Sequence, residues 1–102
     1  MPKPPIRFAD RCPTHPGEVL REDVLPASGL SKAEVARRLK ISRQTLHDIL
    51  AEEQPVSPAV AIRLGALFGG GGRSWVRMQA EYDLWHAERE TDVSDIEAVR
   101  AA

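Results

Sequence analysis

Cysteine is almost absent from this chain. Among its 102 residues only Cys12 carries a thiol, so no internal disulfide is possible, as is usual in a reducing compartment. No run of about 18 apolar residues occurs, and we therefore expect no segment that spans a membrane. The N-terminus also lacks the apolar stretch of a secretory signal. Together these absences predict a cytoplasmic protein.

The side chains of a catalytic or metal centre are equally scarce. The three histidines lie far apart, and neither a His-x3-His nor a Cys-x2-Cys pair occurs, so we expect no metal site. His47 and Asp48 are neighbours, but adjacent residues on a helix point about 100° apart and cannot serve as a catalytic base and its orienting group. We expect neither an enzyme nor a bound cofactor.

Net charge is also close to zero, at −1, but it is unevenly distributed. Between Ser31 and Arg43, five basic residues accompany one acid, Glu34, which leaves +4. From Gln79 to the end, seven acids and two arginines leave −5. Separated charge of this kind is expected of a protein with two partners, although two solvated helix faces would explain it as well.

Apolar residues recur at helical spacing and predict an all-α fold of five helices. The first helix is expected to begin at Pro16 and to end at Pro26. Serines that can act as N-caps predict the starts of the next three helices: Ser31, Ser42 and Ser57. Glu34 lies three residues after Ser31 and would complete a capping box with it. Glycines 69–72 predict a flexible connection, because each would cost about 1 kcal/mol inside a helix.

A fifth helix is expected to begin near Arg73, and its large side chains recur at helical spacing. We expect Trp75 and Met78 to pack in the core. Tyr82 and Trp85 are assigned to a dimer interface, because a small bundle has little room for every aromatic ring. Core packing, or a face for a second protein, is the alternative. Residues 93–99 could form a weak sixth helix.

The connection between the second and third helices is very short. Leu39 is the last inward residue of one helix and Ser42 caps the next, with only Lys40 and Ile41 between them. Two amphipathic helices joined so tightly must cross steeply and share a small core, which is the helix-turn-helix arrangement. Such turns usually carry glycine where Lys40 stands, because the backbone there is left-handed, so lysine costs about 1 kcal/mol.

The outward face of the third helix carries side chains that match base edges in a DNA major groove. Arginine bonds guanine, glutamine bonds adenine, and an acid accepts from cytosine. We predict base contacts from Arg43, Gln44, His47 and Asp48. Nearby cations and hydroxyls predict phosphate contacts from Lys32, Arg37, Arg38, Lys40, Ser42 and Thr45. A solvated helix surface is the alternative interpretation.

Four segments together resemble the HigA family of antitoxins, which have a phage-repressor-like helix-turn-helix domain. They are HPGEVLREDVL (15–25), GLSKAEVARRLKISRQTLHDIL (29–50), VSPAVAIRLGALFG (56–69) and SWVRMQAEYDLWHAE (74–88). The resemblance implies a homodimer that binds double-stranded operator DNA with an inverted repeat, its third helices about one helical turn apart. It also implies repression of its own operon and neutralisation of a HigB-type toxin, an mRNA endonuclease.

We therefore divide the chain into three regions. Residues 1–12 form a flexible Pro-rich leader, residues 13–90 a helix-turn-helix DNA-binding domain with a C-terminal dimerisation helix, and residues 91–102 an acidic tail. Charge complementarity makes the tail a candidate contact for the toxin. A solitary helix-turn-helix transcriptional repressor without a toxin partner is the alternative function. The absence of a catalytic cluster argues against the toxin nuclease itself.

Overall fold

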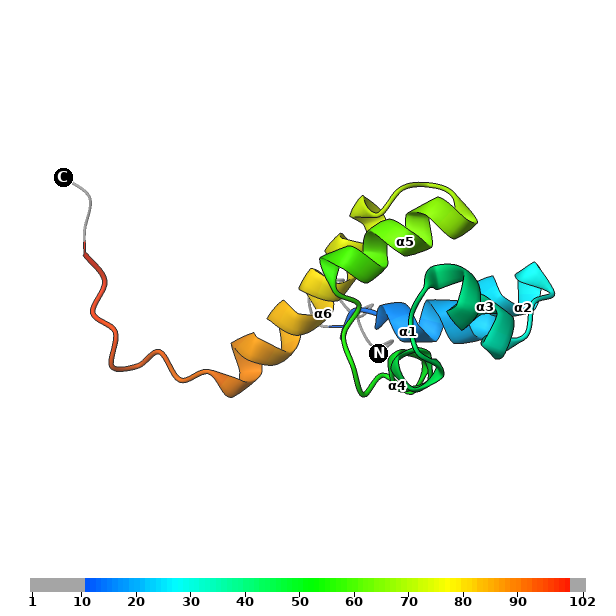
Figure 1. Cartoon of the computed structure of the whole chain (residues 1–102). Helices are drawn as coiled ribbons and strands as arrows, with labels where there is room; N and C mark the ends of the chain where they lie inside the picture. Colours follow the sequence, from blue (N-terminus) through cyan, green and yellow to red (C-terminus); the bar gives the residue numbers. More distant parts are fainter. Residues whose placement is uncertain (1–10, 100–102) are drawn as a thin grey trace, which may run out of the picture.

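The computed structural model describes residues 11–99, and all regular structure in this part of the chain is helical (Figure 1). The elements are α1 (Pro16–Val19), the π-helical turn η2 (Leu20–Val24), α2 (Leu25–Ser28), α3 (Lys32–Leu39), α4 (Arg43–Leu50), α5 (Pro58–Phe68) and α6 (Arg73–Glu90). Because α1, η2 and α2 run on without a break, they make one rod, and the predicted all-α fold of five helices is confirmed. Most of the predicted leader and the last three residues lie outside the described range.

The first helical rod continues past Pro26, so the predicted end at that residue was wrong. Proline has no N–H to donate to the carbonyl four residues earlier. Just before it, the N–H of Leu25 bonds the carbonyl of Leu20, five residues back, which is the π-helical spacing. This wider turn accommodates the proline, and the rod ends at Ser28, before Gly29 with its φ of 70°.

The three predicted serine caps are confirmed. In each case the hydroxyl oxygen accepts a hydrogen bond of 3.0–3.2 Å from the backbone N–H three residues later. The capping box at Ser31 is only half formed, however. The carboxylate of Glu34 accepts hydrogen bonds from Arg37 and Arg38 instead of turning back to the cap.

The core takes one face from each rod, as the helical spacing predicted. Its buried side chains come from every helical rod and from the connection before α5: Leu20, Leu25, Val35, Ala36, Leu39, Leu46, Ile49, Leu50, Val56, Ala61, Leu64 and Trp75. Met78, Leu67 and Phe68 are partly buried against this cluster. The prediction that Trp75 and Met78 belong to the core is therefore confirmed.

Two close backbone approaches fix how the rods meet. A Cβ atom on Gly17 would lie 1.8 Å from the carbonyl oxygen of Ile49, so α1 touches α4 directly. A Cβ atom on Gly65 would lie 2.2 Å from the carbonyl carbon of Gly71. Glycines 69–72 are a connection, as predicted, and the end of that connection packs on α5.

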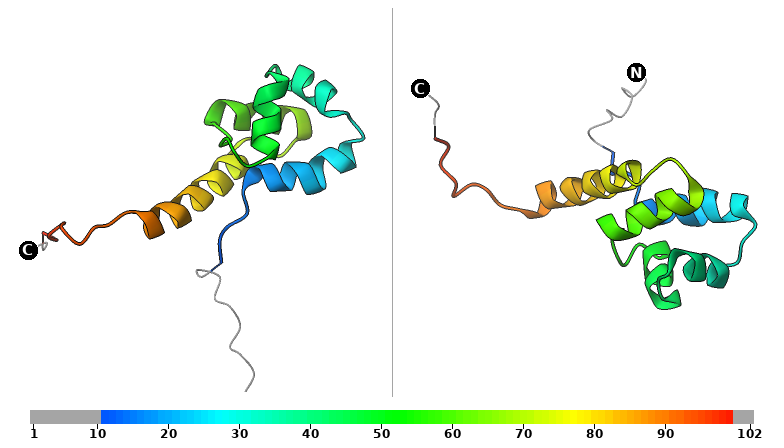
Figure 2. Two further views of the ribbon diagram at one scale, coloured as in Figure 1. Left: turned by 90° about the horizontal axis from the view of Figure 1, so that it is seen from below. Right: turned by 45° about the horizontal axis from the view of Figure 1, so that its top comes forward.

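Gln79 ties α6 to the rest of the domain. Its side chain is buried, its Oε1 accepts from the N–H of Val56 at 2.8 Å, and its Nε2 donates to Asp83 at 2.9 Å. The C-terminal half of α6 then extends away from the other helices, and residues 91–99 continue outward (Figure 2). Residues 91–99 contain no sixth helix; instead, the N–H of Ser94 bonds the carboxylate of Asp92 at 2.9 Å.

Candidate nucleic-acid interface

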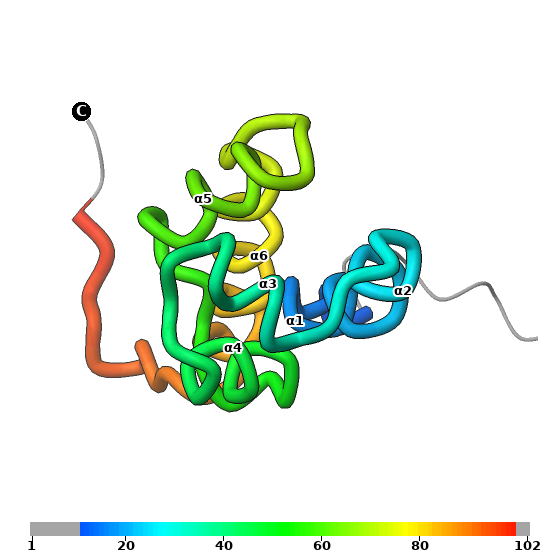
Figure 3. Tube along the Cα trace, turned by 45° about the vertical axis from the view of Figure 1, so that its right-hand side comes forward, coloured from blue at the N-terminus to red at the C-terminus, as the bar shows by residue number. Residues whose placement is uncertain are grey.

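The turn between α3 and α4 is closed by two backbone hydrogen bonds. The N–H of Ile41 bonds the carbonyl of Ala36 at 3.1 Å, and the N–H of Lys40 bonds that of Arg37 at 3.2 Å, the Schellman pattern. Lys40 is left-handed, with φ 60° and ψ 38°, as predicted. The chain thus passes in a few residues from α3 into α4, which lies at the outer edge of the domain (Figure 3).

Arg63 of α5 holds this turn from a neighbouring helix. Its Nη1 donates to the carbonyl of Leu39 at 2.9 Å and to that of Lys40 at 3.1 Å. Carbonyls at the end of a helix lack intrahelical partners, and a cation there also interacts favourably with the helix dipole. Sequence reasoning missed Arg63, because its two partners lie far away along the chain and no local pattern marks it.

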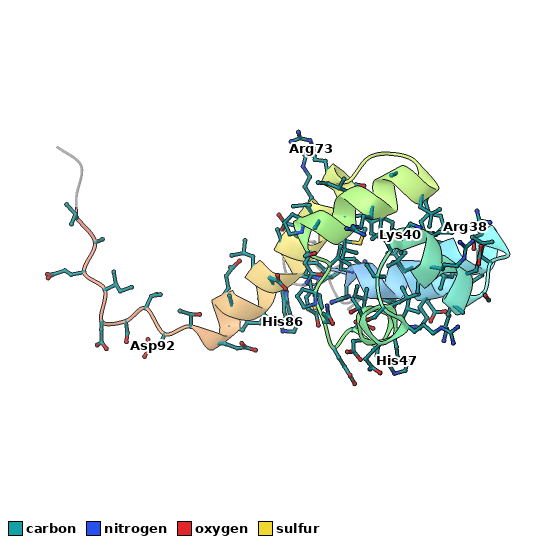
Figure 4. All side chains as sticks on the ribbon, viewed as in Figure 1. Arg38, Lys40, His47, Arg73, His86 and Asp92 are labelled. Atoms are coloured by element: carbon teal, nitrogen blue, oxygen red, sulfur yellow. The ribbon has the colours of Figure 1, made fainter. Side chains whose placement is uncertain are left out.

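The four residues predicted to contact bases share one face of α4. Arg43, Gln44 and His47 are exposed, while the opposite face of the helix is buried in the core. His47 points away from the rest of the domain (Figure 4). Asp48 is half-buried, and its Oδ1 accepts a hydrogen bond of 2.8 Å from Nε2 of Gln44. Within residues 11–99, this face therefore presents one bonded pair, Gln44 with Asp48, and two side chains that bond no other side chain, Arg43 and His47.

The cations predicted to contact phosphate fall into two groups. Among residues 11–99, the ion pairs do not involve Lys32 or Lys40, and both are exposed. Arg37 and Arg38 share the carboxylate of Glu34, with Nε–O distances of 2.9 and 2.8 Å. The hydrogen bonds from Arg37, and then the one from Arg38, lower the pKa of Glu34 to about 2. Glu34 stays ionised and offsets one of the two arginine charges.

Ser42 and Thr45 bond to each other at the start of α4. Oγ of Ser42 donates to Oγ1 of Thr45 at 2.8 Å and accepts from the N–H of Thr45 at 3.0 Å. Because the Ser42 proton is used inside this pair, the hydroxyl proton of Thr45 is left to donate outward.

The two residues assigned to a dimer interface lie on the outer half of α6. Tyr82 is half-buried, and its ring meets that of His15 edge-on with a centroid distance of 4.8 Å. Trp85 is half-buried beneath the guanidinium of Arg89, which lies 3.5 Å from the ring centroid. Leu84, next to Trp85, is 53% exposed. The outer half of α6 thus exposes Leu84 among charged side chains, with Trp85 half-buried beside it, and Tyr82 is partly engaged within the chain.

His15, in the opening HPGE motif, has a structural role that sequence reasoning did not assign. Its ring is buried, and Nδ1 accepts a hydrogen bond of 2.8 Å from the N–H of Gly17, which caps α1. Burial lowers the pKa of His15 below its ordinary value, against the opposing charges of Glu52 and Asp83. The HPGE motif could have indicated this role, because it marks a capped helix start whose Gly17 packs closely against α4.

This geometry defines the helix-turn-helix class. A short turn presents α4 at the surface, the core anchors it from behind, and its outer face carries polar side chains that fit a major groove. In residues 11–99 no group of three or more His, Cys, Asp or Glu is placed to hold a metal ion. Among the helices of the same range, none has the length and apolar character needed to cross a bilayer.

Comparison with known proteins agrees with this class. Residues 18–74 match the family described as "Helix-turn-helix domain". Virulence-associated protein I of Dichelobacter nodosus is 41% identical over 76 residues, which are 74% of this chain and 70% of that protein.

Two solved structures are similar over most of the chain. One, Pseudomonas aeruginosa antitoxin HigA with the higBA promoter, has 41% identity and a TM-score of 0.73 over 76% of this chain and 85% of that one. The other, antitoxin GraA in complex with its operator, has 32% identity and a TM-score of 0.75 over 100% of this chain and 98% of that one. The chain belongs to the helix-turn-helix family, in the group that includes the HigA antitoxins, as its motifs predicted.

Proposed function

We propose that this chain is the DNA-binding antitoxin of a type II toxin–antitoxin system. It represses its own operon and neutralises a HigB-type mRNA endonuclease in the cytoplasm. One observation carries the proposal: α4 exposes Arg43, Gln44 and His47 on a fold similar to those of HigA and GraA, whose structures include a promoter and an operator. An exposed helix with these side chains fits the base edges of a major groove.

The contacts to DNA divide into base readout and phosphate binding. Arg43, Gln44 and His47 face the base edges, and the surrounding cations and the Thr45 hydroxyl take phosphates: Lys32, Arg37, Arg38, Lys40 and Thr45. The Ser42 proton is bonded to Thr45, so Ser42 supports this contact by holding the Thr45 side chain. Lys32 and Lys40 contribute more to the salt dependence than the two arginines, because Arg37 and Arg38 already share Glu34.

A homodimer formed through the outer half of α6 would bring two α4 helices to an inverted repeat. Leu84 is exposed there beside Trp85, with Tyr82 one turn earlier, and these residues are the proposed interface. In this arrangement residues 13–90 form the DNA-binding and dimerisation unit, and residues 1–12 are a leader. The acidic tail, residues 91–102, is the proposed contact for a basic toxin.

Binding to the upstream promoter tests the first half of the proposal. Fluorescence anisotropy would compare a duplex of this promoter with a shuffled duplex, and we expect at least 10³-fold tighter binding to the promoter, about the lower end for specific proteins. Arg43→Ala and Gln44→Ala should each cost about 1–3 kcal/mol on the promoter and relax the preference at one base pair. Equal losses on both duplexes would reduce these residues to phosphate contacts.

Co-expression with the product of the neighbouring reading frame tests the second half. We expect the two proteins to co-purify, and growth arrest by the neighbour alone to be relieved when this chain is present. A chain that binds its promoter but neither co-purifies with the neighbour nor rescues growth would instead be a solitary helix-turn-helix transcriptional repressor.

A further inference from the structure

Gln44 and Asp48 form a bonded pair on the exposed face of α4. They lie one helical turn apart, and Nε2 of Gln44 donates to Oδ1 of Asp48 at 2.8 Å. An ionised carboxylate can only accept hydrogen bonds, so it must face the NH₂ end of the amide and not its oxygen. Asp48 therefore fixes which way round the Gln44 amide lies.

The Gln44 amide, once held by Asp48, keeps a definite pattern of hydrogen-bond donors and acceptors for a ligand. One N–H is committed to Asp48, which leaves the Oε1 acceptor and one N–H donor of Gln44 free. Adenine presents the complement in the major groove, an N6–H donor beside the N7 acceptor, whereas guanine presents two acceptors, N7 and O6. A free glutamine could turn both N–H groups toward guanine. The Gln44 amide cannot do so while Asp48 holds one of them.

Burial also separates the roles of the two residues. Gln44 is exposed, whereas Asp48 is half-buried and lies a turn further along α4. A carboxylate brought close to DNA is repelled by phosphates, and it gains least from direct contact when one oxygen is already bonded. Holding the Gln44 side chain before binding avoids an ordering cost that corresponds to roughly 2- to 10-fold in affinity.

We propose that Asp48 is a positioning residue, which sets the Gln44 amide to read adenine, and is not itself a base-contacting residue. The inference rests on the proposed function, in which α4 enters the major groove. It differs from the sequence prediction, which gave Asp48 a base of its own. The competing role is direct acceptance from the N4 amino group of cytosine, which would act at a separate base pair.

A base-pair scan of the promoter half-site separates the two roles. Each position of the duplex is substituted in turn, and binding is measured for the wild type and for Asp48→Ala, Asp48→Asn, Gln44→Ala and the Gln44→Ala/Asp48→Ala double variant. The readout is the ratio of affinities for adenine and guanine at each position. Loss of the charge at residue 48 should raise the affinity for every duplex by the same factor, so this effect cancels in the ratio. Unfolded protein binds neither duplex and does not change the ratio.

We expect the wild type to favour adenine over guanine at one position by roughly 5- to 150-fold, and Gln44→Ala to remove this preference. Asp48→Ala should reduce it at the same position by roughly 2- to 10-fold. Asp48→Asn keeps an acceptor oxygen, but its NH₂ group can also donate to Oε1 of Gln44, so the amide is no longer held one way round and the preference should fall between those of the wild type and Asp48→Ala. In the Gln44→Ala background, removing Asp48 should change the ratio no further. Glu53→Ala, which removes an exposed carboxylate beyond the end of α4, is the control and should leave this position unaffected.

Two results would overturn the inference alone. An Asp48→Ala protein with an unchanged ratio shows that the bond does not position Gln44. A change in preference at a different base pair, surviving in the Gln44→Ala background, shows that Asp48 reads that base itself. A wild type without preference for any duplex contradicts the proposed function, and the inference falls with it.

Discussion

Lys40 combines a left-handed backbone conformation with an exposed positive charge that is proposed to contact a DNA phosphate. Its φ of 60° is a conformation that costs a residue with a Cβ atom about 1 kcal/mol relative to glycine. Lys40→Gly should therefore raise the free energy of unfolding in urea by roughly 0.5–1 kcal/mol. It should also lower the slope of log K against log salt for promoter binding by about one unit.

Lys32→Ala is the matched control for Lys40→Gly. It removes one exposed charge from the same surface and relieves no left-handed residue. We expect a comparable fall in the salt slope with little gain in stability. A Lys40→Gly chain with an unaltered salt slope would remove Lys40 from the phosphate contacts.

Gly17 is required for space rather than for backbone freedom. Its added Cβ would lie 1.8 Å from the carbonyl oxygen of Ile49, so Gly17→Ala must push α1 away from α4. We expect a loss of about 3 kcal/mol or more in urea unfolding, the upper end for overpacked cores. Gly29→Ala is the control: it meets no atom within 4 Å but has a φ of 70°, and should cost about 1 kcal/mol. Equal losses of stability in Gly17→Ala and Gly29→Ala would show that α1 can shift away from α4 at little cost.

His15 links stability to pH. Its folded pKa is lowered below 6.5, so the unfolded chain takes up a proton at a pH where the folded chain does not. The contribution of His15 to the free energy of unfolding is therefore complete above its unfolded pKa. This contribution is lost as the pH falls from the unfolded pKa to the lower pKa of the folded chain. Urea unfolding should show lower stability at about pH 5.5 than at about pH 7.5.

His15→Asn tests the origin of this pH dependence. Asparagine keeps an oxygen that can accept from the N–H of Gly17, but it does not titrate. We expect the difference in stability between the two pH values to shrink in this variant. An unchanged difference would assign it to other groups.

At the scale of elements, a helix end could be predicted from the sequence only where the hydrogen bond that sets it joins residues close together in the chain. The serine caps bond to the residue three positions later, so Ser31, Ser42 and Ser57 marked their helix starts correctly. The end at Pro26 was missed because a π-helical turn accommodates the proline. Arg63 and Gln79 act on distant parts of the chain, and spacing alone cannot show such partners.

The candidate site shows the same limit. Spacing placed Arg43, Gln44 and His47 on the outer face of α4, because a helix has a regular period. Spacing did not show that Asp48 bonds Gln44 rather than pointing outward, or that Arg37 shares Glu34 with its neighbour. These pairings depend on which rotamers the side chains adopt, so the face could be predicted but not the free groups on it.

Arg63 couples α5 to the helix-turn-helix pair, and its loss should loosen the turn. Arg63→Met keeps much of the aliphatic stem but removes the hydrogen bonds to Leu39 and Lys40, so we expect a loss of about 1 kcal/mol in urea unfolding. Hydrogen exchange at the N–H of Ile41 should become faster. Arg77→Met, an exposed arginine on α6, is the control for charge and should leave both unchanged. Unaltered exchange in Arg63→Met would show that the backbone bonds of the turn suffice.

At the scale of the whole molecule, the two proposed interfaces lie on different helices of the same folded domain. α4 lies at one edge of the domain, whereas the outer half of α6 extends away from it (Figure 2). Gln79 fixes the inner part of α6 to the connection between α4 and α5. A dimer formed on the outer part would therefore hold two α4 helices at a set spacing, which an inverted repeat requires.

Leu84→Glu tests this arrangement. Leu84 is 53% exposed, so the charge should leave the monomer folded but place two carboxylates in the proposed interface. Sedimentation should then show a monomer. Because two linked half-sites gain roughly 10²- to 10⁴-fold from effective concentration, affinity for the full inverted repeat should fall by about that factor. Binding to a single half-site should stay the same.

Ile62→Glu is the matched control, since Ile62 is 67% exposed on α5 and lies outside the proposed interface. We expect it to remain dimeric and to bind the full repeat normally. A Leu84→Glu chain that stays dimeric would move the interface away from Leu84 and Trp85. A monomeric chain that keeps full affinity for the repeat would show instead that α4 reads each half-site without help from a partner copy.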